Sequence, residues 1–66
     1  MPLIQIHILE GRSPAIKKRL IEEVTEAVHR SLGGSREAIR IAIYEIAEEH
    51  WAVGGVTMKE RRLSNS

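Results

Sequence analysis

Two isoleucine-rich segments, separated by one amphipathic segment, dominate the hydrophobic pattern of this chain. The first runs from Leu3 to about Leu9 and carries isoleucine at every second position. Near-continuous apolar runs rich in β-branched residues are typical of strands covered on both faces. We therefore expect a buried strand that ends at the polar sequence Glu10-Gly11-Arg12-Ser13.

An amphipathic helix is predicted from Pro14 to about Leu32, because apolar residues recur there every three or four positions. Those residues are Ile16, Leu20, Val24, Ala27, Val28 and Leu32. Ser13 is a favourable N-cap, and Pro14 suits the first helical position, where a missing N–H is no loss. Gly33-Gly34 should end the helix, since glycine accepts the left-handed conformation of a helix cap.

The second isoleucine-rich segment, residues 39–46, predicts a strand that completes a β-α-β unit. The crossover in such a unit is right-handed and its strands are parallel. One helix covers only one face of a two-stranded sheet, whereas parallel sheets require cover on both faces. We therefore predict an α/β fold in which the sheet is shared with another copy of the chain, giving a homo-oligomer.

The remaining residues predict a turn, a hairpin and a tail. Residues 47–50 indicate a surface turn, and residues 51–58 a short hairpin bent at Gly54-Gly55. Residues 59–66 are polar and are expected to form a flexible tail, with Arg61 and Arg62 in solvent. Residues 1–66 are predicted to form a single domain.

Composition and charge exclude several classes of protein. A chain of 66 residues buries only about 60% of its unfolded surface and usually needs additional stabilisation. It has no cysteine, and its three histidines are far apart, so neither a disulfide nor a structural metal is indicated. A net charge of +1 is too small for a nucleic-acid footprint. No apolar run approaches the ~20 residues that span a bilayer, and no secretory signal precedes the fold. We expect a cytoplasmic protein.

Candidate chemistry begins at Pro2. If Met1 is removed, Pro2 becomes the amino terminus and its ring nitrogen becomes a secondary amine. A free α-amino group has a pKa near ~8, and apolar surroundings or nearby cations lower that pKa. A neutral amine near pH 7 is well suited to moving protons. The alternative is that Pro2 merely opens the strand, where its missing N–H has no consequence.

Two arginines are candidates for more than surface charge. Arg12 lies at the strand-to-helix turn, and Arg40 lies inside an otherwise apolar strand. A guanidinium in such a strand is unfavourable to bury unless it is paired or faces a cavity. Arg40 therefore faces either a carboxylate in a structural ion pair or a ligand.

These features together resemble the 4-oxalocrotonate tautomerase family. They are Pro2 opening an isoleucine-rich strand, His-Ile-Leu-Glu-Gly-Arg-Ser at residues 7–13, Arg40 in the second strand, and Trp51 before Gly54-Gly55. The similarity covers the chain except for its last several residues. It implies a tautomerase-superfamily β-α-β subunit, with dimers built on a shared sheet and three dimers closing into a hexamer.

The resemblance also implies a role for each matching residue. Pro2 would be the general base and acid, and Arg12 would bind the substrate carboxylate remote from the reacting enol. Arg40, from a neighbouring subunit, would bind the 2-oxo group and its adjacent carboxylate. Trp51 would replace the usual phenylalanine of an aromatic wall, and the backbone N–H of Leu9 would contact substrate. No metal or organic cofactor is expected, because this proton transfer needs only a positioned base and charge stabilisation.

The implied reaction converts a 2-hydroxydienedioate such as 2-hydroxymuconate to its conjugated oxo isomer, as in the breakdown of aromatic compounds. Two arginines suit a dicarboxylate, because the guanidinium fork matches carboxylate geometry. Relatives that act on haloacrylates have an additional arginine where this chain has Leu9, and an acid that activates water; Glu45 and Glu48 stay open for that role. The sequence is also compatible with a non-catalytic binding module and with one subunit of a hetero-oligomer.

Overall fold

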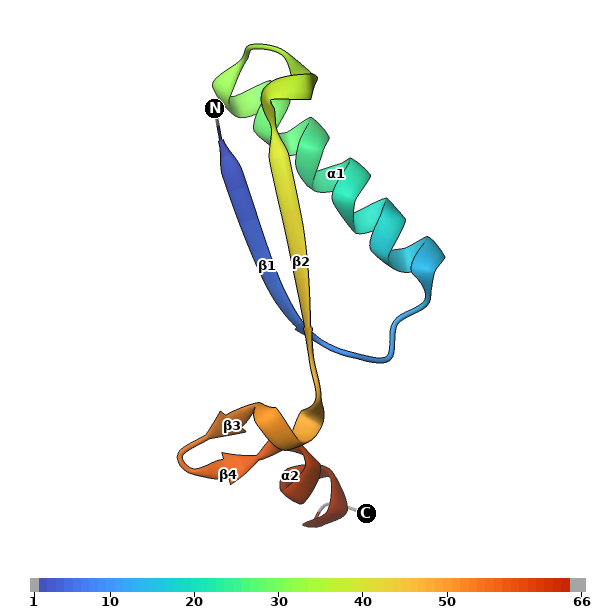
Figure 1. Ribbon diagram of the computed structural model, residues 1–66, viewed down its shortest axis with the longest axis vertical. Coiled ribbons are helices and arrows are strands. Elements are labelled where there is room, and N and C mark those ends of the chain that lie inside the picture. Colours follow the sequence, from blue (N-terminus) through green and yellow to red (C-terminus); the bar gives the residue numbers. More distant parts are fainter. Residues whose placement is uncertain (1, 65–66) are drawn as a thin grey trace.

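The computed structural model describes residues 2–64. Its helices and strands are β1 (Leu3–Leu9), α1 (Pro14–Leu32), β2 (Arg40–Ile46), β3 (Ala52–Val53), β4 (Val56–Thr57) and α2 (Met58–Ser64). Two short 3-10 turns flank β2: η1 (Arg36–Ala38) before it and η2 (Glu48–His50) after it. Figure 1 shows the two long strands with α1 beside them, and the C-terminal elements as a separate group beyond the end of β2.

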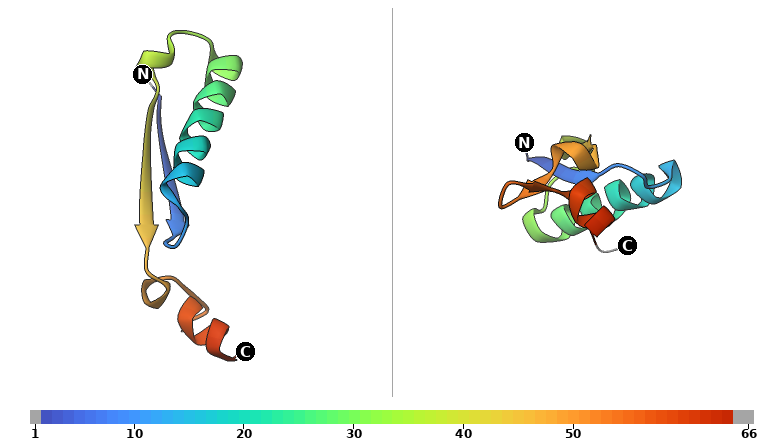
Figure 2. Two further views of the ribbon diagram at one scale, coloured as in Figure 1. Left: turned by 90° about the vertical axis from the view of Figure 1, so that its right-hand side faces the viewer. Right: turned by 90° about the horizontal axis from the view of Figure 1, so that it is seen from below.

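The β-α-β unit and its parallel strands are confirmed. Leu3 pairs with Arg40 at one end of the sheet, and Leu9 pairs with Ile46 at the other. Helix α1 lies over one face of β1 and β2, as the left view of Figure 2 shows. The isoleucines of β1 are half-buried, while Leu3, Gln5 and His7 between them are exposed. The isoleucine row therefore faces α1, and the alternate row lies on the uncovered face of the sheet.

Helix α1 begins and ends where the sequence predicts. The Ser13 Oγ accepts a hydrogen bond from the Ile16 backbone N–H at 3.3 Å. At the other end Gly33 has φ 77° and donates its N–H to the His29 carbonyl at 2.9 Å. Within residues 2–64 no helix, α1 included, combines the length and apolar character needed to cross a membrane.

The predicted flexible tail is wrong for residues 59–64, which belong to α2. Thr57 and Glu60 cap this helix reciprocally: the Thr57 Oγ1 accepts from the Glu60 N–H at 3.1 Å, and the Glu60 Oε1 accepts from the Thr57 N–H at 3.0 Å. This is the capping box Thr-x-x-Glu, a helix-start signal that can be read from sequence. Residues 65 and 66 of the predicted tail lie outside the described residues.

One chain does not enclose a core. Among residues 2–64 none is fully buried, and Leu3 and Leu32 are 63% and 70% exposed. The accessible surface is 5094 Å², compared with about 4,200 Å² for a folded monomer of this mass. The radius of gyration is 15.4 Å, whereas a compact domain of this length has about 11 Å. The single chain therefore leaves apolar side chains exposed that it cannot bury by itself.

Candidate active site

Pro2 and Arg40 lie together at one end of the sheet. The Arg40 backbone N–H donates to the Pro2 carbonyl at 2.9 Å, because the first rung of the parallel ladder forms there. The Arg40 guanidinium turns toward η1 and donates through Nη1 to the Glu37 carbonyl. Within residues 2–64 no carboxylate pairs with Arg40. A structural ion pair, one of the two possible roles of this arginine, is therefore absent from the described chain.

The η1 turn that receives Arg40 is itself anchored to α1. Arg36 donates two parallel hydrogen bonds to the Glu26 carboxylate, at 2.7 and 2.9 Å. The hydrogen bond with Arg36 is the main reason that the pKa of Glu26 lies below its ordinary value. The Ser35 Oγ also caps η1 by accepting from the Glu37 N–H at 3.1 Å. The η1 turn, whose Glu37 carbonyl orients Arg40, is thus fixed by the Arg36–Glu26 ion pair and by the Ser35 cap.

Arg12 and Leu9 lie at the opposite end of the sheet. The Arg12 Nη1 donates to the Leu9 carbonyl at 3.0 Å, which folds the arginine back over the end of β1. Seven residues of β1 separate this end from Pro2, a span of about 23 Å in an extended strand. One chain therefore does not bring Arg12 to Pro2.

Trp51 directly follows η2, in the group of C-terminal elements that Figure 1 shows beyond the end of β2. Its side chain is half-buried, and its carbonyl accepts a hydrogen bond from the Met58 N–H at 2.7 Å. The predicted site residues thus form two groups within one chain. Pro2 and Arg40 stand at one end, and Leu9, Arg12 and Trp51 belong to the other.

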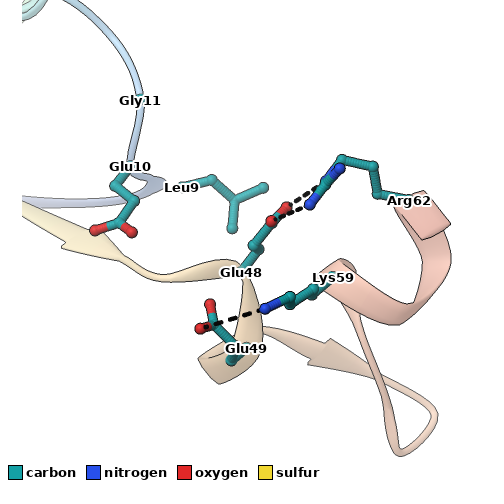
Figure 3. A pocket seen from close by; sticks show the side chains of 7 residues that line it. All are labelled: Leu9, Glu10, Gly11, Glu48, Glu49, Lys59 and Arg62. Atoms are coloured by element: carbon teal, nitrogen blue, oxygen red, sulfur yellow. Dashed lines mark hydrogen bonds and ion pairs between the residues drawn. The ribbon is translucent and has the colours of Figure 1, made fainter.

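A hollow of about 470 Å³ opens at this second end, between β1 and the C-terminal elements. Its lining residues, drawn in Figure 3, are Leu9, Glu10, Gly11, Glu48, Glu49, Lys59 and Arg62. Arg62 donates to both oxygens of Glu48, at 2.7 and 3.0 Å, and the Lys59 Nζ lies 4.0 Å from Glu49. Arg62 is exposed, as expected from the sequence, but its guanidinium is paired with Glu48. Glu48 and Arg62 are 14 positions apart, so no periodic pattern in the sequence predicts their contact.

The sequence model of the family described as "Tautomerase enzyme" matches residues 2–61. This chain belongs to the tautomerase family.

Relatives of this tautomerase extend over nearly its whole length. A 2-hydroxymuconate tautomerase of Pseudomonas putida is 49% identical over 63 residues, which are 94% of this chain and all of that protein. A probable tautomerase of Staphylococcus epidermidis is 44% identical over 61 residues, 92% of this chain and all of its own. The family and these relatives make the chain an isomerase.

Solved structures agree with this assignment. TomN, a 4-oxalocrotonate tautomerase homologue of the tomaymycin biosynthetic pathway, superposes with a TM-score of 0.94 at 46% identity, covering 98% of this chain and 100% of its own. A heterohexameric 4-oxalocrotonate tautomerase from Chloroflexus aurantiacus superposes with a TM-score of 0.86 at 35% identity, covering 91% and 97%. The predicted fold class is thereby confirmed.

Cations hold Glu45 and Glu48, the two carboxylates considered as activators of water in this tautomerase. Glu45 accepts a hydrogen bond from the Lys17 Nζ at 2.8 Å. Glu48 accepts two from Arg62, and these hydrogen bonds are the main reason that its pKa lies below the ordinary value. A lowered pKa makes the Glu48 carboxylate a weaker base, and Lys17 occupies the Glu45 carboxylate. Neither arrangement therefore favours the haloacrylate type of reaction.

Proposed function

We propose that this tautomerase converts a 2-hydroxydienedioate, such as 2-hydroxymuconate, to the 2-oxo-3-enedioate without a cofactor. One observation carries the proposal: Arg12 and Arg40 are both exposed, and within residues 2–64 their guanidinium groups donate to backbone carbonyls and form no ion pair. Two guanidinium groups whose charge no carboxylate neutralises suit a substrate with two carboxylates. The name of the Pseudomonas putida relative supports the same substrate.

Pro2 is the proposed base and acid. Removal of Met1 gives a secondary amine, and in its neutral form this amine takes a proton from the dienol and returns it to a distant carbon. Arg12 binds the remote carboxylate and draws electron density toward it, while Arg40 binds the 2-oxo group and the adjacent carboxylate. The backbone N–H of Leu9 also contacts substrate. The arginine cations and an apolar wall at Trp51 favour the neutral amine, and the cations stabilise the dienolate charge as it develops.

The proposed site requires an oligomer. Pro2 and Arg12 stand at opposite ends of β1, so a second chain must supply one of them, and the family resemblance implies that Arg40 also comes from a neighbouring subunit. A second chain also supplies the cover that the exposed face of the sheet lacks. We propose a homohexamer built as three dimers that share their sheets. A hetero-oligomer, as in the Chloroflexus aurantiacus protein, is the alternative that subunit analysis of the native protein distinguishes.

The test is the ultraviolet absorbance of 2-hydroxymuconate after addition of protein whose intact mass shows that it begins at Pro2. Wild-type protein should convert this compound far faster than the buffer does. Pro2→Ala should lose most of the rate, with a residual fraction from the primary amine. A fully active Pro2→Ala protein would contradict the mechanism. No conversion by wild-type protein would contradict the substrate, and a binding role would then be favoured.

A further inference from the structure

We infer that the ion pair between Glu48 and Arg62 is a latch that sets the position of Trp51. Glu48 lies in η2, three residues before Trp51, and Arg62 lies in α2, so the pair closes the segment that carries the tryptophan. Both are positioning residues, since they act through Trp51. The inference rests on the proposed function only for its effect on catalysis, because the position of Trp51 can be measured without substrate.

The geometry of the pair is that of a specific contact. Arg62 donates through Nε to one carboxylate oxygen of Glu48 at 3.0 Å and through Nη2 to the other at 2.7 Å (Figure 3). Two parallel hydrogen bonds fix the relative orientation of two planar groups, which a single lysine contact does not. The pair therefore constrains the direction of α2 as well as its distance from η2.

Three further contacts fix the start of α2. The Met58 N–H donates to the Trp51 carbonyl at 2.7 Å, and the Arg61 Nη2 donates to the Val53 carbonyl at 2.9 Å. The capping box of Thr57 and Glu60 holds the first turn of α2. These contacts tie α2 to the hairpin at its beginning, and the Arg62 pair ties it to η2 one turn further on. Attachment at two points stops the helix from pivoting about its first turn.

The only other ion pair between α2 and η2 within residues 2–64 is weak. The Lys59 Nζ lies 4.0 Å from the Glu49 carboxylate, at the limit for such a contact. Removal of the Glu48–Arg62 pair therefore leaves this long contact as the ion pair between α2 and η2 in the described chain. The segment between them would then relax, and the half-buried Trp51 side chain would gain access to solvent.

The experiment uses the fluorescence of Trp51, which is the single tryptophan of the chain. Glu48→Gln and Arg62→Gln each remove one partner of the latch in the full assembled protein. Each should shift the emission maximum to longer wavelength and increase quenching by acrylamide. Each should also lower kcat/KM by roughly two- to fivefold, since Trp51 no longer closes the site. Glu26→Gln, which breaks the equally bidentate pair with Arg36 at the other end of the molecule, is the matched control and should leave the emission unchanged.

The charge reversal Glu48→Arg with Arg62→Glu separates a latch from a general loss of structure. This double variant should restore the wild-type emission and quenching, whether or not either single variant assembles fully. Unchanged emission in the single variants, or failure of the reversal to restore it, would overturn the inference. If wild-type protein shows no tautomerase activity, the proposed function fails while the emission data still decide the latch.

Discussion

Pro2 and Arg12 stand at opposite ends of β1, since one residue precedes the strand and the other follows it. The separation of about 23 Å exceeds the reach of any dienedioate, so a site that uses both residues joins two chains. The hydrogen bond between Arg12 and the Leu9 carbonyl keeps this arginine at its own end of the sheet. The proposed site therefore couples catalysis to assembly.

Mixed oligomers of two inactive variants should regain activity. Pro2→Ala lacks the base and Arg12→Ala lacks a carboxylate clamp, so each alone should be nearly inactive. Co-assembly places an intact Pro2 beside an intact Arg12 in about a quarter of randomly paired sites of a closed symmetric oligomer. The rate of co-refolded mixtures measures this directly. No gain over the separate variants would mean that both residues serve one site from the same chain.

Arg12→Ala and Arg40→Ala should each lower kcat/KM by roughly a hundredfold, because each removes a charge-assisted contact to a substrate carboxylate. Steady-state kinetics with 2-hydroxymuconate provides the measurement, and light scattering verifies assembly. Arg19→Ala is the matched control, since Arg19 is exposed on α1 and belongs to neither group of site residues. An equal loss in Arg19→Ala would attribute the effect to net charge.

The Glu26–Arg36 pair should affect catalysis through Arg40. Arg36→Gln frees η1 from α1, so the Glu37 carbonyl holds the Arg40 guanidinium less well. We expect a rise in KM of a few-fold, with a smaller change in kcat. Arg36→Lys keeps the positive charge but loses the two parallel hydrogen bonds of the guanidinium. Its KM should therefore lie between those of wild type and Arg36→Gln. An unchanged KM in Arg36→Gln would show that η1 holds Arg40 without this anchor.

Acid should open the latch at Trp51. Hydrogen bonds from Arg62 hold the pKa of Glu48 below its ordinary value of 4.5. A carboxyl group whose pKa is depressed on folding stabilises the folded state above its unfolded pKa. That stabilisation is lost as the pH falls through the folded pKa. The latch is therefore intact at neutral pH and opens only below pH 4.5.

The pH dependence of Trp51 emission tests this opening. Wild-type emission should move to longer wavelength below pH 4.5, whereas Glu48→Gln should start shifted and change less. Hydrogen bonds from Thr57 also lower the pKa of Glu60, so the α2 cap is lost in the same acidic range. Glu60→Gln removes that contribution and should keep the Glu48 part of the transition. Identical acid transitions in wild type and Glu48→Gln would contradict the prediction.

Local signals in the sequence predicted most of the fold. The limits of β1 and α1 follow from isoleucine alternation, the Ser13 cap and Gly33, all of which act within a few residues. Helix α2 was not predicted although Thr57 and Glu60 have the spacing of a capping box, because the apolar periodicity of residues 58–64 is weak. The candidate site was predicted as a set of residues. Its division between two ends follows from the extended β1 between Pro2 and Arg12 and from the parallel pairing of Arg40 with Leu3.

The features that the sequence did not predict depend on contacts between residues far apart in the chain. The pairs Glu48–Arg62 and Glu26–Arg36 join residues 14 and 10 positions apart. Each arginine has another glutamate much closer in sequence, Glu37 for Arg36 and Glu60 for Arg62, so only the folded geometry selects its partner. Residues that position a site are accordingly harder to predict than residues that contact substrate.

The proposed mechanism depends on the amino group of Pro2, and one comparison tests that role most directly. Protein that begins at Pro2 is compared with protein that carries one uncleaved residue before Pro2, which converts the ring nitrogen into an amide. Absorbance of 2-hydroxymuconate should fall rapidly with the first protein and at the buffer rate with the second, with both equally assembled by light scattering. Equal rates for the two proteins would show that the ring nitrogen of Pro2 is not the base.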